Sequence, residues 1–426
     1  MQDRKHRFPA GRHGGLELSM AESAGFDAAP AAPSALSNGL ILLFAVACAF
    51  SVANVYYAQP LLDALAQDFG FSQASVGMVI AATQAGCALA LLLVVPLGDL
   101  MSRRRLIMVQ LCLLGATLAA VGLASSPAAL LAGMLGTGLL GTAMTQGLIA
   151  YAASAAAPAQ RGRVVGAAQG GVVIGLLLAR TVAGMLADWS GWRAVYFASA
   201  AAALLMLLAL WRMLPAQAVP AQRLSYFRLI GSMFTMLATE RLLQIRGLLA
   251  MLMFAAFSIF WTALVLPLSA PPYSFSHSAI GAFGLVGVLG ALAASRAGHW
   301  ADRGYAQRTT GAALLLLLLS WLALWLMPYS LWALVLGIVL LDVGGQAIHV
   351  TNQSMIFQTQ PSAHSRLVAC YMLFYSIGSG VGAILSTNMY AIAGWSGVCL
   401  LGATVSLLAL MFWQLTLRYT DNHQTK

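Results

Sequence analysis

Charged residues are too scarce in this sequence to cover a water-soluble protein. Only 8% of the 426 residues are Asp, Glu, Lys or Arg, 60% are hydrophobic, and the mean hydropathy is +0.83. An average soluble domain carries about 25% charged residues. The shortage excludes a soluble globule and indicates that lipid is the solvent of this chain.

Motifs that define several classes of protein are also missing. No Gly-x4-Gly-Lys-Ser/Thr loop occurs, and the longest cytoplasmic loop is too short for an ATPase domain, which argues against ATP-driven transport. The five cysteines all lie in hydrophobic stretches without Cys-x-x-Cys spacing, so neither disulfides nor a thiolate metal site is predicted. We therefore expect no cofactor and no bound metal.

Long hydrophobic runs are what the sequence has in abundance. A helix that crosses a bilayer needs roughly 20 mostly apolar residues, and twelve such stretches follow one another along the chain. The sequence therefore predicts an all-α membrane protein with twelve transmembrane helices. We expect them at 38–58, 73–98, 104–124, 128–152, 163–184, 194–213, 248–269, 278–297, 309–327, 331–356, 367–390 and 395–416.

The placement of the basic residues predicts the orientation of these spans. A formal net charge of +10 would also suit a protein that binds nucleic acid. However, all of the 22 Lys and Arg residues except Arg180 and Arg193 lie in the tails, in the even-numbered loops or at the span ends that border those loops. By the positive-inside rule, both termini and the central linker are cytoplasmic. The basicity thus reflects topology and contact with anionic membrane lipid, and no nucleic-acid partner is expected.

Hydropathy divides the chain into five segments. Residues 1–37 are predicted to be a disordered cytoplasmic tail, within which Met20 is an alternative start. No cleaved signal peptide is expected, because span one is too long and begins too late. The other segments are a six-helix half at 38–213, a cytoplasmic linker at 214–247, a second six-helix half at 248–417 and a tail at 418–426.

An internal repeat relates the two halves. A constant shift of 203 residues aligns positions of types that are rare in this composition. Selection for positive loops can align Arg positions but not Pro, Gly and Trp positions, so the pattern indicates a duplicated six-helix unit. Two such halves form a cavity at their interface, with a binding site near the bilayer midplane. The aligned pairs are Asp99 with Asp302, Arg105 with Arg308, Gly141 with Gly344, Pro158 with Pro361, Arg163 with Arg366, Gly175 with Gly378 and Gly191-Trp192 with Gly394-Trp395.

Two loops resemble the signature of the major facilitator superfamily, in which an Asp precedes a basic cluster. They are Gly98–Arg105, after span two, and Gly298–Arg308, after span eight. The resemblance implies a secondary transporter of the plasma membrane, or of a bacterial inner membrane, whose halves rock about a central site. We expect it to act as a monomer. The acids can pair with a facing Arg or a helix terminus and hold one end closed, or they can be solvated anchors. The gating candidates are Asp99, Arg103, Arg104, Arg105, Asp302, Arg303 and Arg308.

A second resemblance is to bacterial drug and small-metabolite exporters of that superfamily. It rests on Asn54–Pro60, at the end of span one, and on the glycine motif of span five. That motif ends in Arg180, where drug/proton antiporters typically carry a Gly-Pro pair. Ala132 and Gly133 stand where those antiporters often have a buried Arg. The resemblance implies that the protein exports a small molecule. The chain lacks two features typical of drug/proton antiporters, the Gly-Pro pair and the buried Arg.

Span ten contains a narrow stripe of polar residues. Asp342, Gln346, His349 and Gln353 are spaced i, i+4, i+7 and i+11, so they share one helix face. Asp342 is predicted roughly 18 Å deep at 1.5 Å per residue. A charge at that depth must face the bundle interior, water or a partner, and both Asp and His can exchange protons there. Asp342 and His349 are therefore the proton-coupling candidates, the alternative being a permanently hydrogen-bonded structural stripe.

Further polar and aromatic residues within the spans are candidates for contact with substrate. Gln146 aligns with His349 in the repeat and can bind substrate or join helices. Arg180, predicted near the outer leaflet, can bind an anionic group or extend harmlessly to the interface. Tyrosines near span ends also occur commonly as interfacial anchors. The substrate-binding candidates are Asn54, Tyr57, Gln59, Gln146, Arg180, Gln346, Gln353, Tyr371 and Tyr375.

These observations favour a secondary active transporter that exports a small amphipathic or polar molecule, coupled to protons, by alternating access. An uncoupled uniporter or an importer is the alternative within transport. A receptor that senses substrate without moving it is expected to carry a large cytoplasmic signalling segment, which the sequence lacks. An intramembrane enzyme is least favoured, because no nucleophile or metal triad accompanies Asp342 and His349.

Overall fold

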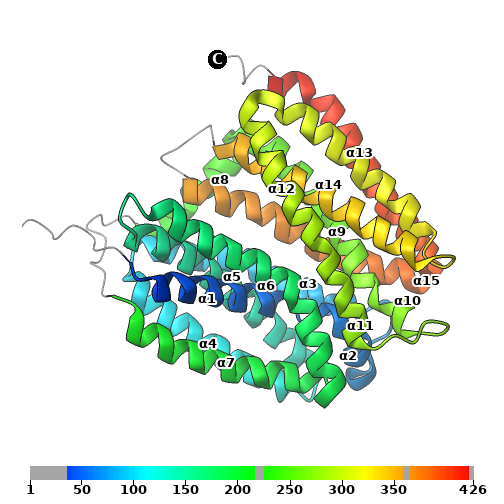
Figure 1. Cartoon of the computed structure of the whole chain (residues 1–426), viewed down its shortest axis with the longest axis horizontal. Helices are drawn as coiled ribbons and strands as arrows, with labels where there is room; N and C mark the ends of the chain where they lie inside the picture. Colours follow the sequence, from blue (N-terminus) through cyan, green and yellow to red (C-terminus); the bar gives the residue numbers. More distant parts are fainter. Residues whose placement is uncertain (1–35, 216–224, 358–363, 422–426) are drawn as a thin grey trace, which may run out of the picture.

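The computed structural model describes residues 36–215, 225–357 and 364–421. Over these ranges the chain is almost entirely helical and contains no strand. Met20 and nearly all of the predicted N-terminal tail lie outside the described residues, as do parts of the predicted linker and C-terminal tail. Figure 1 shows the described chain as two helical bundles that follow each other in sequence.

The N-terminal half consists of six crossings, two of which contain changes of helix type. Ser37 and Ser126 cap the first turns of α1 and α5 with their hydroxyl groups. The elements are α1 (Asn38–Tyr56), η1 (Gln59–Leu61), α2 (Leu62–Phe69), α3 (Gly77–Leu89), η2 (Ala90–Val94), η3 (Val95–Asp99), α4 (Arg103–Gly122), α5 (Pro127–Ala155), α6 (Arg161–Ser190) and α7 (Trp192–Met213).

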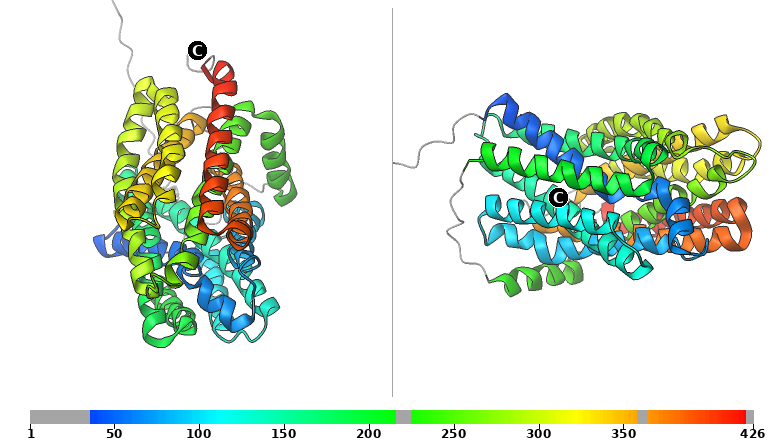
Figure 2. Two further views of the ribbon diagram at one scale, coloured as in Figure 1. Left: turned by 90° about the vertical axis from the view of Figure 1, so that its right-hand side faces the viewer. Right: turned by 90° about the horizontal axis from the view of Figure 1, so that it is seen from below.

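The C-terminal half follows a short helix that is not a crossing. That helix, α8 (Tyr226–Thr239), lies in the predicted linker and buries Leu229, Met233 and Met236 on one face. Figure 2 shows it set off beside the bundle. The remaining elements are α9 (Arg241–Ala263), α10 (Val265–Ser269), α11 (His277–Ala282), η4 (Phe283–Gly287), α12 (Val288–Trp300), η5 (Ala301–Tyr305), α13 (Ala306–Trp325), α14 (Leu331–Phe357) and α15 (His364–Asp421).

The predicted twelve crossings are confirmed, although the described residues form 11 separate candidate spans. The last of these spans contains two crossings, because Gly394 adopts φ 61° and ψ −156° and breaks the helical path within α15. Beyond this kink, Trp395 donates a hydrogen bond to the Leu324 carbonyl, and Trp413 donates one to Gln307. The segment therefore runs back along α13. Gly191, the repeat equivalent of Gly394, also has a positive φ, of 79°, between α6 and α7.

Glycines allow the closest helix contacts within each half. A Cβ added at Gly171 or Gly175 would lie 2.0 or 2.3 Å from carbonyl oxygens of α1. In the other half, a Cβ at Gly378 or Gly382 would lie 2.1 or 2.5 Å from carbonyl oxygens of α9. Small residues permit such approach between helices in lipid. The two halves thus use the same device at corresponding helix pairs.

Along α6 the contacts between the halves are concentrated at one end of the bundle, whereas on the α3 side they continue through η2 onto α15. We call the end where α1 begins and α15 ends the terminal end, and the opposite one the far end. At the far end, α6 packs against α11, and Gly184 approaches the His277 carbonyl so closely that a Cβ would lie 2.2 Å from it. On the other side, Thr387 of α15 donates a hydrogen bond to the Ala74 carbonyl. Toward the terminal end α6 hardly touches α12, and the halves are inclined to each other (Figure 1).

Candidate functional site

A cavity of about 420 Å³ lies between the two halves. Its walls include α1, α5 and α6 from the first half and α9, α14 and α15 from the second. A volume of this size is typical of sites that enclose small molecules. The cavity has the position that the repeat predicts for a binding site.

The polar stripe of α14 forms one wall of this cavity. Asp342, Gln346, His349 and Gln353 all line it, as the i, i+4, i+7, i+11 spacing predicts for residues that face the bundle interior. Asp342 is 4% exposed. The His349 ring forms a hydrogen bond of 3.0 Å through Nδ1 with the Tyr371 hydroxyl group, which lies behind it. Tyr371 is thus placed to orient His349 and does not line the cavity.

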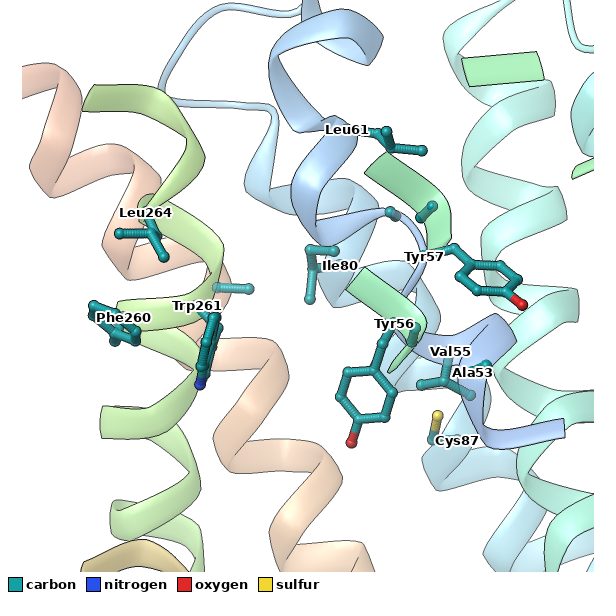
Figure 3. Close-up of a cluster of buried hydrophobic side chains, with 14 of the residues drawn as sticks. Ala53, Val55, Tyr56, Tyr57, Leu61, Ile80, Cys87, Phe260, Trp261 and Leu264 are labelled. Atoms are coloured by element: carbon teal, nitrogen blue, oxygen red, sulfur yellow. The ribbon is translucent and has the colours of Figure 1, made fainter. Parts of the chain in front are cut away.

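Arg180 turns into the interface between the halves and does not reach the bundle exterior. The residue is 3% exposed, and its Nε donates a hydrogen bond of 2.7 Å to Oε1 of Gln59. Its guanidinium carbon lies 4.0 Å from the ring centroid of Trp261 and 5.5 Å from that of Tyr56. Figure 3 shows Tyr56 on α1 and Trp261 on α9, on the two sides of the interface. Cation–π contacts of this kind stabilise a cation that has lost its water.

Arg180 and Asp342 come from different halves and interact electrostatically across the cavity wall. They are not in direct contact, and Nη2 of Arg180 and Oδ1 of Asp342 are buried without a hydrogen-bond partner among the described residues. Glycines one turn apart make room for both side chains. A Cβ at Gly284 would lie 3.4 Å from Arg180, and one at Gly287 would lie 2.7 Å from Oδ2 of Asp342.

The other predicted substrate contacts divide into cavity residues and residues behind them. Gln146 lines the cavity from α5, and Tyr375 lines it from α15, where its hydroxyl group is hydrogen-bonded to that of Tyr56. Asn54 is buried and donates to the Phe50 carbonyl of its own helix. Tyr57 is buried outside the cavity lining. Gln59 reaches the site only through its bond to Arg180.

Several cavity residues were not among the sequence candidates, and Gln169 and Phe254 are two of them. Gln169 of α6 lies eleven positions before Arg180, the same spacing that separates Asp342 from Gln353, so the two share a helix face. An amide within a span at that spacing was a usable signal. Phe254 packs at right angles against Tyr375, with ring centroids 4.2 Å apart. Nothing in the sequence distinguishes Phe254 from the many apolar residues around it.

The predicted gating acids and bases lie at the terminal end. Asp99 pairs with Arg103 at 3.1 Å, and Arg103 also donates to the Ala150 carbonyl, so this cluster lies within the first half. Arg104 donates to the Trp211 carbonyl. The remaining candidates are Arg105, Arg303 and Arg308, which are exposed, and Asp302, whose side chain lies outside the described residues.

An unpredicted ionic cluster joins the halves at the far end. His277, the first residue of α11, lies 3.0 Å through Nε2 from Asp63 and 3.1 Å through Nδ1 from Asp188, which belong to the other half. The backbone N–H groups of His277 and Ser278 also donate to the Asp188 carboxylate. Each ring nitrogen of His277 faces a carboxylate and must carry a proton to donate a hydrogen bond to it. A neutral imidazole carries only one such proton, so the cluster needs one additional proton. Its partners are over 80 residues apart in sequence from His277, so no local pattern pointed to it.

Two parallel six-helix halves with a central cavity define the class of secondary transporters that work by alternating access. The comparison with known families agrees with this class. The chain belongs to the Major Facilitator Superfamily, whose family model matches residues 40–296 and 246–426. The protein is accordingly a multi-pass membrane transporter and not an enzyme.

Named relatives are also transporters. The chain is 45% identical over 380 residues to the uncharacterized transporter YgaY of Escherichia coli. The aligned region covers 89% of this chain and 95% of YgaY. It is 30% identical over 369 residues to a Streptomyces coelicolor protein named a probable transporter, SCO4007, with 86% of this chain and 85% of the other covered.

Solved structures of low sequence identity share the fold. A bacterial homologue of the human lysosomal transporter Spinster, in an inward-facing and unoccupied conformation, has a TM-score of 0.74 at 16% identity and covers 90% of this chain and 97% of its own. The nucleoside transporter NupG has a TM-score of 0.67 at 16% identity, with 88% and 98% covered. These likenesses support the twelve-helix, two-half architecture.

Proposed function

We propose that the protein exports a small amphipathic or polar molecule from a bacterial cytoplasm in exchange for protons. The observation that carries the proposal is Asp342, a carboxyl group in the wall of the central cavity that faces Arg180 of the other half. A carboxyl group in such surroundings changes its protonation when its solvent access or its partner changes. Rocking of the halves alters both, so Asp342 is the group through which protons drive the cycle.

The other cavity residues have supporting roles in this proposal. His349, held by Tyr371, is a second proton-accepting group in the cavity wall. Gln146, Gln346 and Gln353 offer uncharged donors and acceptors for substrate on both halves, as Tyr375 does. Asp99 and Arg103 stabilise the first half at the terminal end. In the second half, the repeat equivalents Asp302 (of Asp99) and Arg308 (of Arg105), together with the neighbouring Arg303, are proposed as the corresponding gating group.

Orientation follows from the basic loops. In the proposed orientation both termini are cytoplasmic, as the positive-inside rule favours, and the far end, where the His277 cluster and α3–α15 join the halves, faces outward. A cavity reached from the cytoplasmic side is suited to loading a substrate for export. Basic side chains such as Arg105 then lie near anionic lipid headgroups.

Proton release from energised, inside-out membrane vesicles tests the proposed function. A pH-sensitive dye reports the proton gradient while a panel of small molecules is added to vesicles that contain wild-type protein or Asp342→Asn. The exposed surface variant Arg212→Gln is the matched control. We expect at least one compound to collapse the gradient with wild type and with the control but not with Asp342→Asn. Equal responses from wild type and Asp342→Asn would remove Asp342 from coupling, and equilibration of a labelled compound without proton movement would indicate a uniporter.

A further inference from the structure

The charges in the cavity are balanced, which restricts the substrate. Among the described residues that line it, Arg180 and Asp342 are the only formally charged side chains. They lie on opposite halves, on α6 and α14. A substrate held between the halves therefore meets one positive and one negative group.

Neither of these two charges is fully satisfied by the protein. Among the residues that the structure describes, Arg180 donates one hydrogen bond, to Gln59, while Nη2 of Arg180 and Oδ1 of Asp342 have no hydrogen-bond partner. Buried polar atoms in folded proteins are paired in the great majority of cases. Two such atoms of opposite charge at one cavity point to a ligand that pairs with both.

Aromatic side chains surround the two charges. Trp261 lies against the guanidinium group and beside the carboxyl group of Asp342. Phe254, Phe257 and Tyr375 continue this surface along the second half. An apolar or aromatic substituent can pack there, next to a polar head group that lies between Arg180 and Asp342.

We propose that the substrate is an amphipathic zwitterion of the amino-acid type, with a carboxylate and an ammonium group a few bonds apart and an apolar side group. The carboxylate binds Arg180, the ammonium group binds Asp342, and the side group packs on Trp261 and Phe257. An anion would leave Asp342 unpaired beside it, and a cation would leave Arg180 unpaired. A zwitterion leaves neither charge unpaired and adds no net charge to the site.

This substrate class rests on the proposed transport function and explains its coupling. When Asp342 takes up a proton it loses its charge, and the substrate ammonium group loses its partner. Proton and substrate therefore compete for one carboxyl group, which produces exchange. A simple anion would instead bind better after protonation and would travel with the proton.

Three matched probes test the class directly. Phenylalanine, phenethylamine and 3-phenylpropanoate share one apolar group and differ in charge as zwitterion, cation and anion. Their binding to the full-length protein in lipid nanodiscs is measured by thermal stabilisation and by equilibrium dialysis, with no proton gradient present. We expect phenylalanine to bind roughly tenfold or more tightly than either analogue, which corresponds to one charge-assisted hydrogen bond.

Single substitutions should reverse the preference in opposite directions. Arg180→Gln should weaken phenylalanine binding roughly tenfold and make phenethylamine the probe that binds most tightly. Asp342→Asn should also weaken phenylalanine binding roughly tenfold, but should make 3-phenylpropanoate the probe that binds most tightly. The surface variant Arg212→Gln should keep the wild-type order. The proposal is overturned if an analogue of single charge binds wild type as well as phenylalanine does, if both substitutions weaken all probes equally, or if phenylalanine does not bind.

Failure of the substrate class is distinct from failure of the coupling. Proton competition is measured separately, as the change in phenylalanine affinity with pH in wild type and in Asp342→Asn. The other titratable groups among the described residues that line the cavity are Arg180, His349, Cys87, Tyr56 and Tyr375. Zwitterion selectivity without this pH dependence would keep the class and reject the coupling. Proton release by compounds of single charge would keep the coupling and reject the class.

Discussion

Single residues in the cavity depend on partners from the opposite half, and Trp261 shows this most directly. Its ring lies 4.0 Å from the guanidinium carbon of Arg180, which has left water and is held by one hydrogen bond, to Gln59. Trp261→Leu removes the π face, while Trp261→Phe keeps a smaller one. We expect the leucine variant to lose about 1–2 kcal/mol of stability, from the cation–π contact, and the phenylalanine variant to lose less. Thermal unfolding in detergent measures both, and identical losses would show that the aromatic face of residue 261 does not stabilise Arg180.

Residue positions were predictable where one helix alone determines them. The i, i+4, i+7, i+11 spacing was enough to place Asp342, Gln346 and His349 on one cavity wall. Arg180 was harder, because the helical rise gives only its depth, whereas its direction follows from the Gln59 bond and the rings around it. His277 could not be found in this way, since its partners lie on other helices.

At the scale of elements, close packing of α6 on α1 predicts a sharp difference between two neighbouring glycines. A Cβ at Gly175 would lie 2.3 Å from the Ala49 carbonyl oxygen, so alanine there must push the helices apart. Gly170 on the same helix has nothing within 4 Å of its Cβ position. We expect Gly175→Ala to destabilise the protein by about 1–3 kcal/mol, and Gly170→Ala to stabilise it by up to about 1 kcal/mol.

Unfolding of both glycine variants in detergent, with fluorescence or thermal detection, gives the comparison. A loss at Gly170 equal to that at Gly175 would contradict the packing argument.

The number and order of the elements were predictable from hydropathy and the 203-residue repeat, because each crossing must span the same thickness of lipid. Close approach between particular helices was not, because a glycine pattern does not identify which neighbour it faces.

The two halves meet at the far end partly through the His277 cluster, whose hydrogen bonds require an additional proton, and this requirement determines how pH should act on the conformation. In the closed state His277 meets Asp63 and Asp188, the charged groups that contact it, through both ring nitrogens. When the halves separate there, the imidazole no longer has carboxylates on both sides, and the extra proton is held less tightly. Closure therefore binds a proton, so lowering the pH should favour the closed far end, and raising the pH should favour its opening.

Distances between spin labels on the two halves measure this equilibrium. Cysteines introduced at the exposed far-end positions Gln73 and Tyr329, with Cys112 replaced by serine, report the separation in lipid nanodiscs as the pH is varied. The short-distance population should grow as the pH falls in the wild-type background and should lose much of this response in His277→Gln. His299→Gln, at the terminal end, should retain it. If His277→Gln responds to pH as the wild type does, the proton that closes the far end lies elsewhere, and Asp342 would then be the group that links the conformation to pH.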